Sequence, residues 1–113
     1  MTRTTVFQVT ADHRAKAWLA AHPSDVPRVI AYEVHRCCGG GKICNVVVRP
    51  SSDRDDASAY TPALLEDGTR LLVDSRAANR LPERFGLTVR GLGLLKHLDL
   101  ELDSEQWGEL LYA

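Results

Sequence analysis

Residues 26–49 of the chain read VPRVIAYEVHRCCGGGKICNVVVR. The first part, Val26 to Arg36, has the alternation and β-branched content of a strand, and the last part, Lys42 to Arg49, ends in a run of valines. Between them stand Gly39, Gly40 and Gly41. Three consecutive glycines cost too much conformational entropy for the interior of a strand. The segment therefore predicts two strands joined by a loop that begins with two cysteines.

The register of this expected hairpin follows from its loop. If Arg36 stands opposite Lys42, then Val34 stands opposite Cys44, because antiparallel partners separate in step from the turn. Val34 shares its face with Ile30, so we expect Cys44 on the side of the sheet that faces the core.

The rest of the chain adds helices and further hairpins. The turn Asp67-Gly68 is a strong hairpin signal, because these residue types accept the backbone angles of a tight turn. The remaining expected elements are a strand over 7–10, a helix over 11–21 with Thr10 as its N-cap, strands over 64–66 and 69–73, a short second helix, and strands over 87–89 and 94–102. The second helix is expected over 76–84, capped by Asp74 or Ser75, with Pro82 either breaking it or limiting it to one or two turns.

Together these elements predict an α+β fold, a small, mixed, hairpin-rich sheet with two short helices. The 113 residues are expected to form one domain over 1–113, with a core at about 7–102. Residues 103–113 are expected as a C-terminal helix or arm. Its apolar residues include Trp107.

Charge and hydropathy narrow the class of protein. Fourteen Lys and Arg stand against fifteen Asp and Glu, so the net charge of −1 gives no reason to expect a nucleic-acid partner. No aliphatic run is longer than three residues, the length of Val46 to Val48, and the N-terminus has no signal-peptide pattern. We therefore expect a cytoplasmic protein without a membrane partner, in a compartment that keeps thiols reduced.

The cysteine loop is the chemically dense part of the sequence. Cys37 and Cys38 would react as thiolates, and the neighbouring cations Arg36 and Lys42 would lower their pKa values. The glycines Gly39, Gly40 and Gly41 leave room for a ligand or a partner thiol to approach. Three uses of the loop remain open: binding of iron or an iron–sulfur species, thiol–disulfide exchange, and a glycine loop whose cysteines only fill space.

A metal at this loop would need more ligands than the vicinal pair. Cys44 is a candidate third ligand, and His35 is a further one. Three cysteines cannot supply a four-thiolate cluster within one chain, so a homo-oligomer, His35 or an exogenous thiol would have to complete it. No acid–base pair is joined to these thiols, and the sequence therefore argues against an enzyme.

The order of motifs resembles the HesB-like family, the A-type carriers of iron–sulfur cluster assembly. The resemblance rests on the helix after Thr10, the Cys-Gly-Gly-Gly-Lys run of residues 38–42 and the Asp67-Gly68 turn that leads into Thr69–Asp74. It would cover residues 7–102. It implies a HesB-like fold, an iron–sulfur cargo, a protein partner for cluster exchange, and Cys38 as the family's first cysteine.

The chain departs from that family at the C-terminus. The family carries a second motif there, Cys-Gly-Cys, whereas no cysteine follows Cys44 in this sequence. Cys37 and Cys44 are the candidates to replace the two missing ligands. Two alternatives stand beside the carrier hypothesis: a redox protein that uses Cys37 and Cys38, and a non-catalytic interaction module with structural cysteines that self-associates through Trp107.

Overall fold

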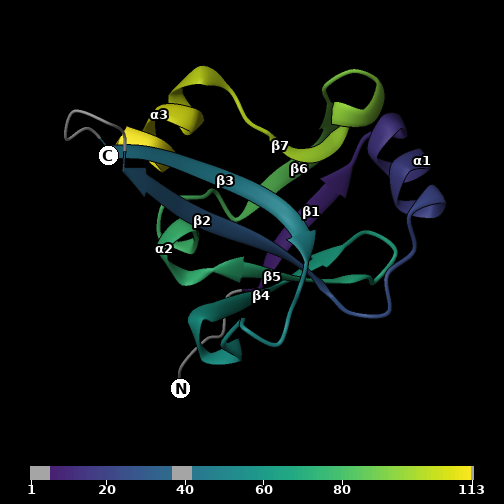
Figure 1. The fold of residues 1–113 in the computed structure, drawn as a ribbon, viewed down its shortest axis with the longest axis horizontal. Helices are drawn as coiled ribbons and strands as arrows, with labels where there is room; N and C mark the ends of the chain where they lie inside the picture. Colours follow the sequence, from purple (N-terminus) through teal and green to yellow (C-terminus); the bar gives the residue numbers. More distant parts are fainter. Residues whose placement is uncertain (1–5, 37–41, 113) are drawn as a thin grey trace.

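The computed structural model describes residues 6–36 and 42–112, with side chains for 6–33 and 45–111 (Figure 1). Seven strands and three α-helices make up this part of the chain. Their bounds are β1 (Phe7–Ala11), α1 (His13–Ala21), β2 (Arg28–Arg36), β3 (Lys42–Pro50), β4 (Tyr60–Leu65), β5 (Arg70–Asp74), α2 (Ser75–Ala78), β6 (Arg84–Arg90), β7 (His97–Glu101) and α3 (Ser104–Tyr112). Short 3-10 turns cover Ala57–Ala59 and Gly93–Leu95.

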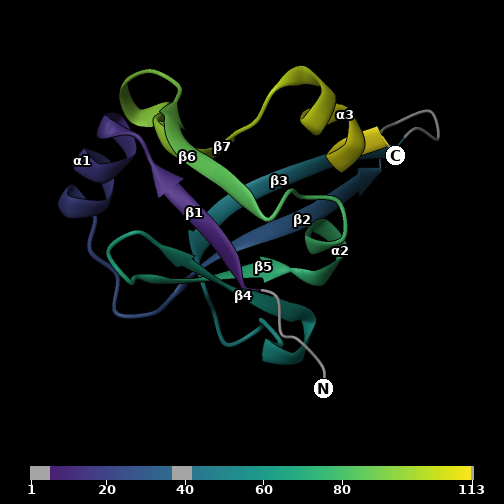
Figure 2. The same cartoon turned by 180° about the vertical axis from the view of Figure 1, so that it is seen from behind.

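All seven strands belong to one mixed sheet. Their order across the sheet is β3-β2-β5-β4-β1-β6-β7. The hairpins β2–β3, β4–β5 and β6–β7 are antiparallel, whereas β1 runs parallel to both β4 and β6, and β2 runs parallel to β5. The sheet curls until its two edge strands, β3 and β7, lie side by side (Figures 1 and 2). The result is a nearly closed, barrel-like sheet.

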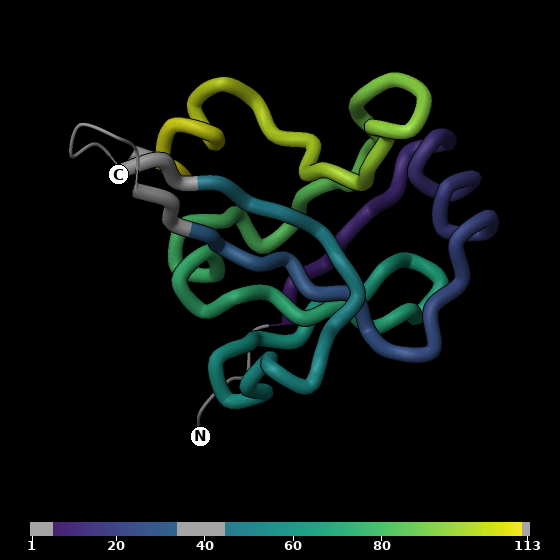
Figure 3. Tube along the Cα trace, viewed as in Figure 1, coloured from purple at the N-terminus to yellow at the C-terminus, as the bar shows by residue number. Residues whose placement is uncertain are grey.

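The expected α+β class is therefore wrong. The described part of the chain is mostly strand, and no helix in it exceeds nine residues. The hairpins were expected, but the three parallel pairings that join them into one sheet were not. These pairings unite segments far apart in the sequence, as the trace in Figure 3 shows, and no local pattern encodes them.

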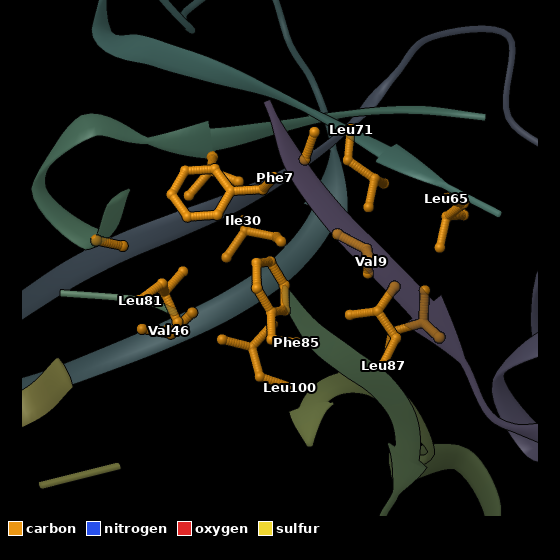
Figure 4. Packing of buried hydrophobic residues seen from close by; sticks show 14 of the residues in the cluster. Phe7, Val9, Ile30, Val46, Leu65, Leu71, Leu81, Phe85, Leu87 and Leu100 are labelled. Atoms are coloured by element: carbon orange, nitrogen blue, oxygen red, sulfur yellow. The ribbon is translucent and has the colours of Figure 1, made fainter. Parts of the chain in front are cut away.

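The core fills the inside of the curled sheet. Ile30 of β2 and Val46 of β3 belong to the same buried cluster as Phe85, Leu87 and Leu100 of β6 and β7 (Figure 4). All five side chains are buried. Because hydrophobic burial is the dominant favourable term in folding, this shared cluster holds the two edges of the sheet together although no backbone ladder joins them.

The first helix begins later than expected. Its N-cap is Asp12, whose side chain accepts a hydrogen bond from the Ala15 backbone N–H at 2.8 Å, and Thr10 lies within β1. The strand continues to Ala11 because Thr10 and Ala11 pair with Gly86 and Leu87 of β6. Strand pairing therefore takes precedence over the capping preference of threonine. The expected end of the helix at Ala21 is confirmed.

The second helix does not extend over the whole range 76–84 and is a single turn, one of the outcomes expected from the proline within that range. It ends at Ala78, and residues 84–90 form β6. Its N-cap is Asp74, one of the two expected caps. Proline at 82 lacks the backbone N–H that a continuing helix needs, and the pairing of β6 with β1 draws the following residues into the sheet.

The C-terminal segment forms a helix that packs on the chain's own core. A capping box starts α3, because Asp103 accepts from the Gln106 backbone N–H at 2.8 Å and the Gln106 side chain accepts from the Asp103 N–H at 3.1 Å. Leu110 is fully buried, and Trp107 is half-buried against the same cluster. This segment is therefore part of the core, not an arm that projects from it.

Candidate functional site

The backbone of the expected cysteine hairpin is confirmed. β2 and β3 pair in an unbroken register in which Arg36 stands opposite Lys42 and Val34 opposite Cys44. His35 pairs with Ile43. The side chains at these six positions lie outside the described ones, and so the expected core-facing orientation of Cys44 stays a prediction.

The central residues of the expected site are not among those that the structure describes. Cys37, Cys38 and the glycines Gly39, Gly40 and Gly41 are outside the described residues. The structure does show where their two attachment points are. β2 ends and β3 begins at the end of the molecule where α3 also lies, away from α1 (Figures 1 and 3).

A polar cluster holds β2 against the start of α2. Its centre is Asp74, the one buried charged side chain among the described residues, with 6% of its surface exposed. Asp74 Oδ2 accepts from the Tyr32 backbone N–H at 3.1 Å, and Oδ1 accepts from the Arg76 N–H at 2.9 Å. The Arg76 guanidinium donates to both carboxylate oxygens and, at 2.7 Å, to the Tyr32 carbonyl.

These bonds decide the charge state of Asp74. Burial acts to raise its pKa, but the hydrogen bonds from the Arg76 side chain and from the backbone N–H groups of Arg76 and Tyr32 outweigh burial. The net effect holds the Asp74 pKa below its usual value. With four donors already in place, the carboxylate has little capacity left to accept a substrate proton. Asp74 is therefore a structural anchor.

Two arginines flank the ring of Tyr32. The guanidinium carbons of Arg76 and Arg80 lie 5.6 and 5.9 Å from the ring centre, within cation–π range. Arg80 also donates to the Leu110 carbonyl at 3.3 Å, which ties α3 to this cluster. Sequence reasoning missed the pair. The signal available was the spacing of two arginines four residues apart after a capping aspartate.

The segment between β3 and β4 is pinned by a second carboxylate. Both oxygens of Asp55 accept from the Arg49 guanidinium at 2.8 Å, and the Tyr60 hydroxyl and the Ser52 backbone N–H also donate to Asp55. The Arg49 side chain is the largest cause that holds the Asp55 pKa far below its usual value. The loop between these strands is thus tied to both β3 and β4.

A groove of about 630 Å³ lies at the other end of the sheet, between α1 and the β4–β5 turn. Leu19 and Leu65 are among its apolar lining residues, and Lys16 and Arg28 are among its charged ones. Arg28 donates to the His22 carbonyl, and burial lowers its pKa. The groove is separate from the cysteine hairpin, since it lies at the opposite ends of β2 and β3.

Among the described side chains there is no group of three or more His, Cys, Asp or Glu that could hold a metal ion. No helix in the described part of the chain is long and apolar enough to cross a membrane.

A comparison with protein families finds no family whose sequence pattern matches this chain. A comparison with curated proteins likewise finds no matching relative.

Proposed function

We propose that the chain is a small cytoplasmic protein that carries iron or an iron–sulfur species on the thiolates of Cys37 and Cys38, as the HesB-like family that it resembles does. The observation that supports this best is the register of β2 and β3. Because Arg36 pairs with Lys42, the vicinal cysteines follow the last paired residue of β2 directly, between two cations.

The position of Cys44 supports the same proposal. Cys44 stands two residues into β3 from Lys42, about 7 Å along the strand. Cys44 therefore lies near the end of the hairpin at which the described part of β2 stops, one residue before Cys37 in the sequence. Thiolate sulfur is the ligand that iron–sulfur species prefer, and neighbouring cations favour the thiolate form. With three cysteines in the chain, a second copy, His35 or an exogenous thiol completes the coordination.

The first prediction concerns this cargo. Anaerobic reconstitution of the full chain with ferrous iron and sulfide is expected to give a visible absorption band and stoichiometric bound iron. Cys38→Ser is expected to abolish both, because it removes the primary thiolate, and Cys44→Ser to weaken them. The matched control is Asp53→Asn, which removes an exposed carboxylate that could hold ferrous iron adventitiously. The control is expected to behave like the parent.

Two results would contradict the proposal. One is a parent chain that binds no iron and shows no band. The other is a band that survives in Cys38→Ser. In the first case, mass spectrometry after equilibration in thiol–disulfide buffers would test the redox alternative, since reversible loss of two hydrogens that requires both Cys37 and Cys38 identifies a disulfide between them.

A further inference from the structure

The turn between β6 and β7 carries an exposed apolar tip. Leu92, Leu94 and Leu95 expose 84%, 104% and 77% of their surfaces. They make up half of the six large hydrophobic residues that are exposed in the described part of the chain, and they are neighbours. The turn projects from the body of the molecule (Figures 1 and 3). Clustering of this kind on a protein surface marks an interaction site.

The backbone holds these leucines outward. Gly91 has a φ of +91°, and a Cβ atom there would lie 2.3 Å from the Leu95 carbonyl oxygen, so the close approach requires glycine. The Leu95 N–H donates to the Leu92 carbonyl at 3.0 Å, and His97 Nδ1 lies 2.8 Å from the Leu95 carbonyl. The tip is thus a closed turn whose polar backbone groups are partly satisfied within it.

The turn itself carries two cations. Residues 90–97 contain Arg90 and Lys96 and no acidic residue. Arg90 is partly compensated by Asp99, at 3.0 Å. The start of α1 lies beside the end of β6, because the Thr88 hydroxyl donates to the Asp12 carboxylate that caps the helix, and the exposed Arg14 follows in the first turn. The turn therefore carries Lys96 in addition to the Arg90–Asp99 pair.

We propose that the β6–β7 tip, residues 91–96, docks on the surface of an anionic lipid bilayer, with its leucines in the interface and Arg90 and Lys96 at the headgroups. Three leucine side chains offer far less than the ~800 Å² per partner that a stable protein interface buries. Binding to a bilayer does not require a partner surface of complementary shape, so a small projecting tip is sufficient. Nearby cations add attraction to anionic lipids.

This inference goes beyond the proposed cargo and does not depend on it. The expectation of no membrane partner considered only apolar runs long enough to cross a bilayer, and a surface tip needs no such run. The tip lies near α1, whereas β2 ends and β3 begins on the side of α3 (Figure 1).

Sedimentation with vesicles tests the docking. The full chain is mixed with vesicles of phosphatidylcholine alone or with about 30% phosphatidylserine, at low and high salt. The parent is expected to sediment with the anionic vesicles and to be released by salt. The Leu94→Ser/Leu95→Ser variant is expected to bind about tenfold more weakly or worse. The control Val26→Ser, at a position 44% exposed in another loop, is expected to bind as the parent does.

Circular dichroism of each variant establishes that it is folded, which is expected because every substituted side chain is exposed. The proposal is overturned if the parent stays in solution with anionic vesicles, or if the double variant sediments as strongly as the parent. Light scattering measures the oligomeric state and so tests whether the tip instead binds a second copy of the chain. A dimer of the parent that the double variant loses would assign the tip to a second copy of the chain, and would likewise overturn the lipid proposal.

Discussion

Leu110→Ala is expected to lower the free energy of unfolding by about 3 kcal/mol, because it empties a fully buried position in the core. For a domain of this size the loss corresponds to a fall in Tm of roughly 10 °C or more. Leu110 belongs to α3, so the result measures how far the C-terminal helix contributes to the folded state. Thermal and urea unfolding followed by circular dichroism would give the value.

The matched control is the neighbouring Glu109→Ala, which is exposed in the same helix and is expected to change stability by less than about 0.5 kcal/mol. If Leu110→Ala were as mild as this control, α3 would not be packed on the core. That result would favour the interaction-module hypothesis, in which this segment associates with another copy of the chain.

Asp74→Ala is expected to cost about 3 kcal/mol at neutral pH. It leaves the Tyr32 N–H without its carboxylate acceptor and removes the cap of α2 and the partner of Arg76. The effect should depend on pH. The pKa of Asp74 is lowered in the folded state, so its contribution is complete above the unfolded pKa of about 3.9 and is lost as the pH falls through the folded value.

The difference in stability between parent and Asp74→Ala should therefore be constant near neutrality and narrow below about pH 4. Asp53→Ala, at an exposed aspartate, is the control and is expected to match the parent throughout. Urea unfolding at a series of pH values provides the comparison. A difference that stayed constant down to the lowest pH would show that the hydrogen bonds at Asp74 do not stabilise its charged form.

Hairpins were the part of this fold that the sequence predicted well. The Asp67-Gly68 turn joins β4 and β5 as expected: Gly68 has a φ of +89°, and the Asp67 side chain accepts from the Thr69 N–H at 2.9 Å. The β2–β3 register was also predicted in full. Both depend on residues a few positions apart, where turn chemistry and alternation act directly.

Errors arose where distant segments decide the outcome. Residues 8–11 pair with residues 84–87, and this pairing both delays α1 and converts the expected end of the second helix into β6. A window of neighbouring residues contains no information on such pairing. The same distinction applies to the candidate site. The ends of β2 and β3 that flank the cysteines were predicted from the sequence. The cluster of Tyr32, Asp74 and Arg76 was not, because it joins β2 to residues about forty positions later.

The central place of β1 has a consequence for how the chain reaches its folded state. β1 is made first, yet its two neighbours are β4 and β6, and both pairings are parallel. Pairing with strands far along the chain raises the contact order. High contact order slows folding, because the entropy cost of closing long loops comes before the stabilising contacts form. During synthesis, the edge of β1 that pairs with β6 therefore stays unpaired until residue 90 has been made. For the same reason, we expect refolding of the full chain in the millisecond-to-second range.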